Sequence, residues 1–317
     1  MTSMNISTLW EKSTLWALKR YGVYSEDIQI ENTIMKALCL RQAEHNAPNG
    51  ISPAVKHMVC VHGLGSSGAA YGQLLPYLAK YWPEVWAPSA PGHGMSPPFP
   101  KSTTQTTEQS ESSSYQRFQN MIYQAWEQCL LHLSKDHPID LLGISLGGAI
   151  SIRFAARFPK RVSSLMLCSP AGAILDENDI AHLKTTFNMS ERGDGLRFLR
   201  TLYHQVPWWA PIMAPLVQMN LKRPEAQSLI QNLKAGDGLN PKEFQDLQVP
   251  TLLIWGQRER ILPASSIDKL LQFAPKDFKL LQPECFSHTP QKEFPKELAD
   301  YLISFQKNLI STPDLTQ

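Results

Sequence analysis

Paired cysteines are the first feature that this sequence of 317 residues lacks. Its five cysteines are odd in number, widely scattered and without a CxxC pair, so neither a disulfide framework nor a zinc site is indicated. We expect them to be reduced and mostly in the core, and we expect no metal ion and no cofactor. The residues are Cys39, Cys60, Cys129, Cys168 and Cys285.

An excess of charge and long apolar runs are missing as well. The 30 Lys and Arg residues nearly balance the 28 Asp and Glu, and no basic run suggests a nucleic-acid partner. No stretch approaches the ~18 apolar residues of a membrane-spanning helix, and the N-terminus does not have the pattern of a secretory signal. We therefore expect a cytoplasmic protein, and because 43% of the residues are hydrophobic we expect it to have a sizeable core.

What the sequence does contain is a glycine-flanked serine where an apolar run meets a helical pattern. The segment Gly143-Ile-Ser145-Leu-Gly147 fits G-x-S-x-G, in which a sharp turn between strand and helix exposes the serine hydroxyl. That turn crowds the positions two before and two after the serine, and glycine relieves the crowding because it has no Cβ. Ser145 is therefore the predicted nucleophile. The alternative is a glycine-rich turn with an incidental serine.

Strands alternate with helices from residue 57 to residue 168, which predicts a parallel sheet covered on both faces. From 173 to 245 the chain is helical in character and interrupted by prolines, and the strand–helix rhythm then resumes. We expect a core over 26–172 and 246–310, with 173–245 as a helical lid inserted after the sixth strand. Residues 311–317 are expected to be a tail.

The N-terminal part of the chain carries its own set of predictions. Residues 1–25 are expected to contain a helix with two tryptophans on its apolar side. This helix either packs on the body of the protein or makes peripheral contact with a membrane, and its thin basic face favours packing. Two antiparallel strands are predicted over 28–34 and 35–41, followed by a turn over 44–53. The polar composition of 97–114 predicts a mobile loop.

A serine hydroxyl needs a base, and the base needs an acid that orients it. His288 is the predicted base because it follows the last predicted strand, and such loops share one edge of the sheet with the serine turn. His93 is its main rival. In the loop 256–263 the one acidic residue is Glu259, which gives the chain order serine, acid, histidine. Asp176 is the alternative acid.

Two backbone N–H groups are predicted to form an oxyanion hole. One belongs to Leu146, directly after the serine, and the other to Leu64, in the loop after the strand over 57–61. Such a pair of donors contributes a few kcal/mol, roughly 10²–10³ in rate. We interpret His62 in the same loop as loop-shaping rather than catalytic. A helix is predicted next, over 69–80.

In combination, these motifs resemble the α/β-hydrolase fold in its lidded, single-domain form. The resemblance implies a mostly parallel sheet flanked by helices, a helical lid and a serine hydrolase, and it is poorly specific for substrate. The lid is similar in style to those of bacterial lipases and monoacylglycerol-lipase-like esterases. The matching stretches are His62-Gly-Leu-Gly65, Ala87-Pro-Ser-Ala-Pro-Gly-His-Gly-Met-Ser96, Gly143-Ile-Ser-Leu-Gly-Gly148, Trp255-Gly256 to Pro263, and Ser287-His-Thr-Pro290.

Departures from the family pattern bear on function. Most relatives have aspartate where Glu259 and Ser89 stand here. The departure at Glu259 bears on which residue is the acid, and the departure at Ser89 bears on how a local loop is supported. A serine nucleophile argues against the dehalogenase and epoxide-hydrolase branches, which use aspartate at that position. Ile144 and Leu146 do not match the Asn–Met surround typical of carbon–carbon bond hydrolases.

The sequence therefore predicts a cofactor-free serine hydrolase that cleaves carboxylic esters through an acyl-enzyme intermediate. Aromatic and methionine side chains of the lid favour an apolar acyl group, although some of them hold the lid together. A thioesterase or acyltransferase with the same triad is the nearest alternative. A ligand receptor with vestigial hydrolysis is the alternative from another class, and the oligomeric state stays open. The candidate substrate contacts are Phe198, Trp208, Trp209 and Met213.

Overall fold

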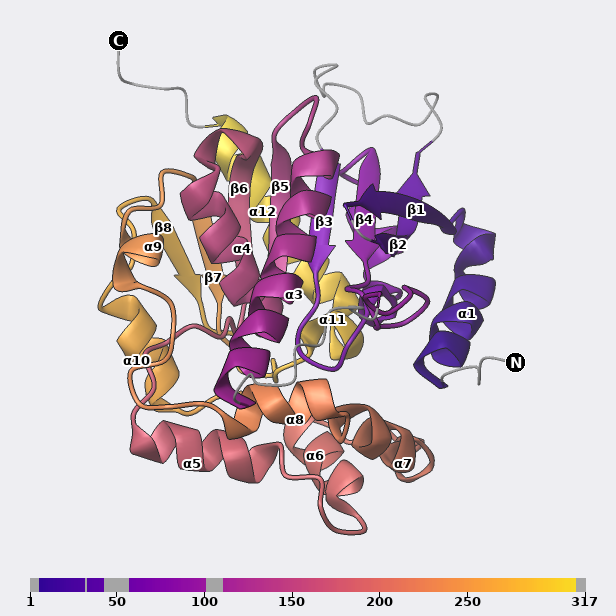
Figure 1. The fold of residues 1–317 in the computed structure, drawn as a ribbon. Helices are drawn as coiled ribbons and strands as arrows, with labels where there is room; N and C mark the ends of the chain where they lie inside the picture. The colour runs from indigo at the N-terminus through magenta and orange to yellow at the C-terminus, as the bar shows by residue number, and fades with distance from the viewer. Residues whose placement is uncertain (1–5, 32, 43–56, 101–110, 312–317) are drawn as a thin grey trace.

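One eight-stranded sheet lies at the centre of the computed structural model, which describes residues 6–31, 33–42, 57–100 and 111–311 (Figure 1). Its strands are β1 (Tyr24–Ile30), β2 (Thr33–Arg41), β3 (His57–Val61), β4 (Glu84–Pro88), β5 (Ile139–Ile144), β6 (Val162–Cys168), β7 (Thr251–Ile254) and β8 (Phe278–Leu281). They lie in the order β1-β2-β4-β3-β5-β6-β7-β8. The β1–β2 and β2–β4 pairs are antiparallel and all other neighbours are parallel, which confirms the predicted mostly parallel sheet.

Helices cover both faces of this sheet, as a doubly covered parallel sheet requires. They are α1 (Ile6–Leu18), α2 (Leu75–Leu78), α3 (Glu111–Leu133), α4 (Leu146–Arg157), α5 (Glu177–Thr186), α6 (Asp194–Leu202), α7 (Ala210–Leu221), α8 (Pro224–Gln231), α9 (Pro241–Gln245), α10 (Ser265–Leu271), α11 (Pro290–Glu293) and α12 (Pro295–Ser311). The described residues also form three short 3₁₀ helices: η1 (Lys19–Tyr21), η3 (Gly68–Tyr71) and η4 (Pro159–Arg161).

Side chains alternate across the strands and divide the core in two. In β3, Val59 and Val61 point to the face covered by α3 and α4, whereas Met58 and Cys60 point to the face covered by α2 and α12. Each such side chain is almost fully buried, and burying one stabilises the fold by about 1.5–3 kcal/mol. The core therefore fixes the sheet from both sides and leaves its carboxyl-end edge available for loops.

Several predicted boundaries are wrong, each for a local reason. The helix predicted over 69–80 is split into η3 and α2, because Gly72 is a poor helix former and Pro76 is tolerated only in a first turn. The predicted antiparallel strand pair is present, but its turn comes earlier, since Ile30 pairs with Thr33. The predicted turn over 44–53, most of the predicted loop over 97–114 and nearly all of the tail lie outside the described residues.

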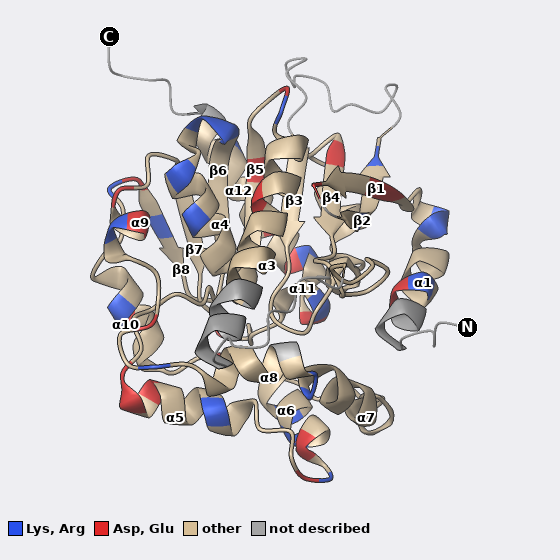
Figure 2. Ribbon diagram, viewed as in Figure 1, with Lys and Arg blue, Asp and Glu red and all other residues tan. Residues whose placement is uncertain are grey.

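Five helices, α5 to α9, separate β6 from β7 along the chain. In Figure 1, α5 to α8 form a layer beyond the end of the sheet toward which β3 points. Helix α7 has no charged residue, so Figure 2 draws it in tan. This segment coincides with the predicted lid; its role as a lid remains a prediction.

The cysteines and the helices bear on two other expectations. Four of the five cysteines are free and buried, whereas Cys285 is free and exposed, so the expectation of core cysteines holds for the other four. Among the described residues, no helix is both long and apolar enough to cross a bilayer. In the same residues, no three His, Cys, Asp or Glu side chains are grouped so that they could hold a metal ion.

Candidate active site

Ser145 lies in a strained turn between β5 and α4. Its φ of 57° and ψ of −126° lie in a region that non-glycine residues rarely adopt, and such strain collects at functional sites. The glycines around it have no room for a side chain, because a Cβ on Gly147 would lie 2.1 Å from the carbonyl oxygen of Val61, and one on Gly143 would lie 2.6 Å from that of Gly147. The turn therefore depends on these glycines, and it holds Ser145 half-buried at the wall of a cavity.

Glu259 and His288 form a buried pair at the same edge of the sheet. Their loops follow β7 and β8, and Nδ1 of His288 lies 2.7 Å from Oε2 of Glu259. The other carboxylate oxygen accepts hydrogen bonds from the N–H groups of Ile261 (2.7 Å) and Leu262 (3.1 Å). Burial alone would raise the pKa of Glu259, but His288 and hydrogen bonds from the Ser169 hydroxyl and the Leu262 N–H outweigh it, so its pKa lies below the ordinary value. Glu259 is therefore ionised at neutral pH and oriented toward the imidazole.

The rival acid Asp176 is engaged elsewhere, whereas the rival base His93 lines the same cavity as Ser145 and His288. Asp176 is the N-cap of α5, where it accepts hydrogen bonds from the N–H groups of Asn178 and Asp179, and its carboxylate also pairs with Lys269 at 2.6 Å. The His93 ring lies 5.4 Å from the ring of His62. The structure thus brings Glu259, and not Asp176, to His288.

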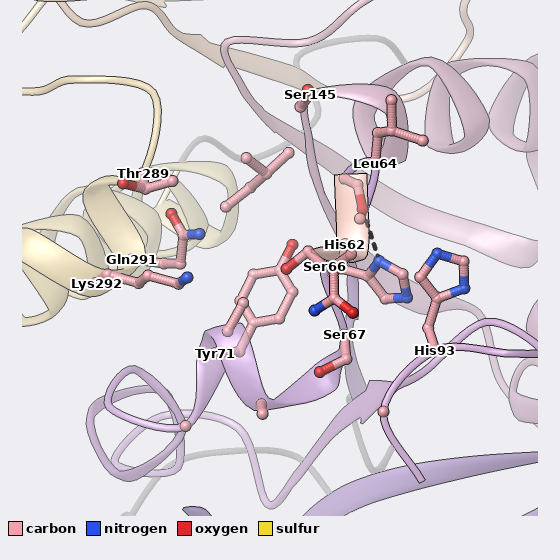
Figure 3. Close-up of a pocket in the computed structure, with 18 of the residues that line it drawn as sticks. His62, Leu64, Ser66, Ser67, Tyr71, His93, Ser145, Thr289, Gln291 and Lys292 are labelled. Atoms are coloured by element: carbon pink, nitrogen blue, oxygen red, sulfur yellow. Dashed lines mark hydrogen bonds between the residues drawn. The ribbon is translucent and has the colours of Figure 1, made fainter. Parts of the chain in front are cut away.

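The loop after β3 lies directly against Ser145. A Cβ on Gly63 would be 3.0 Å from Cβ of Ser145, so this loop approaches the serine by its backbone. Within the described part of the chain, the N–H groups of Leu64 and Leu146 do not donate to another group. Leu146 also opens α4, whose N-terminus carries partial positive charge. Leu64 and Ser145 both line the pocket drawn in Figure 3.

His62 joins this loop to the segment that follows β4. Its Nε2 accepts a hydrogen bond from the N–H of Ala90 at 3.0 Å, and its Nδ1 lies 2.9 Å from the carbonyl oxygen of Gly63. Burial, followed by the neighbouring His93, lowers the pKa of His62 to about 3. The ring is therefore neutral and bridges two loops, which agrees with its interpretation as a loop-shaping residue.

A single large cavity reaches Ser145 and His288, and its volume, as bounded by the described residues, is about 2060 Å³. Of the predicted substrate contacts, Phe198, Trp209 and Met213 line it. Trp208 does not, because its side chain is 85% exposed at the surface. Trp208 therefore lies on the outer surface, and its contact with substrate stays a prediction.

Sequence reasoning missed the contribution of α1 to this site. Residues of α1, including Thr14 and Leu18, line the cavity, and the Glu11 side chain is fully buried beneath it. No local pattern marks Glu11, because it stands beside Lys12 in a helix that reads as partly solvent-facing. The one signal in the sequence was Ser89, which stands where most relatives have aspartate.

Comparison with known proteins identifies the family of this chain. Residues 56–295 match the family model described as alpha/beta hydrolase fold. The pimeloyl-[acyl-carrier protein] methyl ester esterase of Neisseria meningitidis serogroup B (strain H44/76) is 25% identical over 250 residues, which cover 75% of this chain and 87% of that protein. Lipase 1 of Psychrobacter immobilis is 26% identical over 175 residues, covering 53% of this chain and 55% of the lipase.

Solved structures are similar over almost the whole chain. A putative lipase from Acinetobacter baumannii AYE has a TM-score of 0.66 at 19% identity and covers 94% of this chain and 97% of its own. A membrane phospholipase A, a bacterial virulence factor, has a TM-score of 0.69 at 22% identity, with 97% and 93% covered. At these identities the likeness establishes the fold alone. The chain belongs to the α/β-hydrolase-fold family and is of its esterase and lipase type.

Proposed function

We propose that this protein hydrolyses carboxylic esters with an apolar acyl group, with Ser145 as nucleophile, His288 as general base and Glu259 as the orienting acid. The observation that carries the proposal is the buried Glu259–His288 pair, which faces the same cavity as the strained Ser145. A carboxylate held at Nδ1 leaves Nε2 of the imidazole for the serine proton.

In the acylation step, Oγ of Ser145 attacks the ester carbonyl carbon while its proton moves to Nε2 of His288. The carbonyl π electrons move to oxygen, and the N–H groups of Leu64 and Leu146 stabilise the resulting oxyanion. Collapse of the tetrahedral intermediate expels the alcohol, which takes the proton from His288. Glu259 stabilises the imidazolium during this exchange without taking its proton.

Deacylation repeats the same steps with water. His288 removes a proton from the water molecule, the hydroxide oxygen bonds to the acyl carbon, and the second tetrahedral intermediate releases the carboxylic acid. The proton held on His288 returns to Oγ of Ser145, so the enzyme ends unchanged. Apart from the ester and the water molecule, every group that reacts in this proposed cycle belongs to the chain.

The helices α5 to α9 are proposed to act as the lid and to supply the acyl pocket. Phe198, Trp209 and Met213 lie on the cavity wall, which supports recognition of an apolar group. The cavity exceeds the roughly 300–1,000 Å³ typical of small-molecule pockets, so a long acyl chain has room there. A medium or long acyl ester is therefore the favoured substrate class.

Labelling with a fluorophosphonate probe tests the nucleophile. The wild-type protein should be labelled at Ser145 and should turn over p-nitrophenyl esters repeatedly, and Ser145→Ala should lose both properties. Ser190→Ala is a matched control, because Ser190 is exposed and far along the chain in the inserted helices. Undiminished turnover by Ser145→Ala would refute the proposal.

A related assay distinguishes the proposed esterase from a thioesterase and from a ligand receptor. A chain-length series from acetyl to octanoyl, run as esters and as thioesters, should show higher kcat/KM for longer esters than for shorter ones. Preference for thioesters would reassign the protein as a thioesterase. Labelling without repeated turnover would instead favour a ligand receptor, since a receptor needs no deacylation.

Peripheral membrane contact is the remaining part of the proposal. Trp16 on α1 is 78% exposed and Trp208 is 85% exposed, and both flank segments that line the cavity mouth. Tryptophan favours the lipid–water interface, and Lys19 and Arg20 provide positive charge at the end of α1. The double variant Trp16→Ala with Trp208→Ala should sediment less with anionic vesicles than wild type. Equal sedimentation would remove membrane contact from the proposal.

A further inference from the structure

The Glu11 carboxylate is buried at the contact between α1 and the body of the protein. Its side chain has no exposed surface, and its Oε1 accepts a hydrogen bond from the Ser89 hydroxyl at 2.6 Å. Its Oε2 accepts a hydrogen bond from the N–H of Met95, and the N–H of Ala69 also hydrogen-bonds to it. Burying a carboxylate is costly unless donors satisfy it. Glu11 therefore connects α1 to three points on two different loops.

Glycines create the space in which α1 docks. A Cβ on Gly94 would lie 1.6 Å from Oε2 of Glu11, so the carboxylate occupies the place of a side chain. A Cβ on Gly72 would lie 2.7 Å from Thr14 and 2.9 Å from Leu18. Glu11, Thr14 and Leu18 are spaced i, i+3 and i+7 and share one face of the helix. This face of α1 is thus fitted to the two loops.

Both loops that contact Glu11 are connected to residues 63–68, the segment that contains Leu64. The Ser89 hydroxyl, which donates to Glu11, accepts a hydrogen bond from the N–H of Gly68 at 3.0 Å. Gly68 ends the segment that contains Leu64, and Ala69 follows it. The His62–Ala90 hydrogen bond holds the start of this segment. The contacts of Glu11 with Ser89 and Ala69 hold its other end.

We propose that Glu11 is a positioning residue for catalysis: through Ser89 and Ala69, its carboxylate fixes the segment 63–68 that presents the Leu64 N–H to the oxyanion. In this proposal, helix α1 contributes to catalysis by positioning the segment 63–68. The inference rests on the proposed function, because it assumes that Leu64 supplies an oxyanion donor. Misplacing such a donor by about 1 Å costs about 10²-fold in rate.

Position 89 offers a direct way to test this role. Oγ of Ser89 already lies within hydrogen-bond distance of both Glu11 and the Gly68 N–H. Aspartate at position 89 would place its own carboxylate there once the Glu11 side chain is shortened. If a carboxylate at this point is what the loop needs, Ser89→Asp should rescue Glu11→Ala.

The experiment compares kcat and KM for a p-nitrophenyl ester among five proteins: wild type, Glu11→Gln, Glu11→Ala, Glu11→Ala with Ser89→Asp, and the exposed control Glu297→Gln. We expect kcat to fall about 10- to 100-fold in both single Glu11 variants with KM changed less than threefold. The double variant should recover at least tenfold over Glu11→Ala, and the control should match wild type. Thermal unfolding is measured alongside, with the assay run well below each transition.

Three results would overturn the inference. One is wild-type kcat in folded Glu11→Gln, a variant that keeps the size of the side chain and so keeps the test open if Glu11→Ala does not fold. Another is a loss of thermal stability with unchanged kcat, which is what a merely structural contact predicts. The third is a double variant no faster than Glu11→Ala. Turnover by Ser145→Ala would refute the proposed function instead, so the two failures are distinguishable.

Discussion

The two buried glutamates of this protein, Glu259 and Glu11, make an instructive pair. Burial pushes the pKa of each upward, but the outcomes differ: the pKa of Glu259 ends below its ordinary value and that of Glu11 ends above it. Glu259 faces His288, whereas the donors around Glu11 are a hydroxyl and backbone N–H groups. A partner that can become positively charged accounts for the difference. In our proposal, Glu259 stabilises a charge that forms on His288 during reaction, whereas Glu11 holds the backbone in place.

Replacing Glu259 by glutamine should give the largest effect and is the strongest test of this contrast. The amide cannot stabilise an imidazolium, so kcat should fall about 10³- to 10⁴-fold, as for other triads that lose the acid. Unfolding in urea should shift little because the shape is kept. Glu259→Asp retains the charge and should keep more activity than Glu259→Gln. An unchanged rate in Glu259→Gln would move the acid to another residue.

Gly94→Ala tests the docking of Glu11 from the other side of the contact. The methyl group would collide with the carboxylate, and Gly94 has a φ of +55°, so we expect a loss of about 2–4 kcal/mol in unfolding free energy and about a tenfold loss of kcat. Gly193→Ala is the matched control: its φ is +99°, but a Cβ there meets nothing within 4 Å. It should show the backbone cost without the loss of kcat. Equal effects on kcat would argue against a specific role for the contact.

His62 extends the comparison to a residue whose charge is suppressed. Its pKa is lowered from 6.5 to about 3, so between these values the unfolded chain binds a proton that the folded protein does not. Stability therefore falls as the pH drops from 6.5 toward 3, by up to ~1.4 kcal/mol per pH unit for this one group. His62→Gln cannot titrate, and its unfolding free energy should fall less between pH 7 and pH 5. Parallel losses in urea unfolding would contradict this assignment.

The smallest effect is expected in the inserted helices. Phe198 lines the cavity and Trp208 does not, although both are aromatic and stand in the same segment. Phe198→Ala should raise KM for octanoyl esters about fivefold, in line with about 1 kcal/mol of lost apolar contact. Trp208→Ala should leave KM unchanged in detergent-free solution. The measurement is the ratio of the two KM values, and a larger effect at Trp208 would show that Trp208 contacts the substrate.

What could be predicted from the sequence depended on how local each signal is. The serine turn, the choice of strand ends and the order of Ser145, Glu259 and His288 follow from short motifs and from the rule that parallel strands share one carboxyl edge. The split of the helix over 69–80 could have been found from Gly72 and Pro76. The docking of Glu11 could not, because its partners Ser89 and Met95 are distant in sequence and only the fold brings them together.

The Glu11 contact has a consequence for how this chain can be shortened. The family match spans 56–295, so that range invites use as a self-contained catalytic unit. A protein trimmed to it would lose β1, β2, nearly all of α12 and α1, and with α1 the Glu11 carboxylate that accepts hydrogen bonds from Ser89 and Ala69. It would expose Met95 and Gly94 to water where a helix now covers them. If Glu11 has the proposed positioning role, an N-terminal fusion or truncation near α1 should lower kcat although it lies outside the family match.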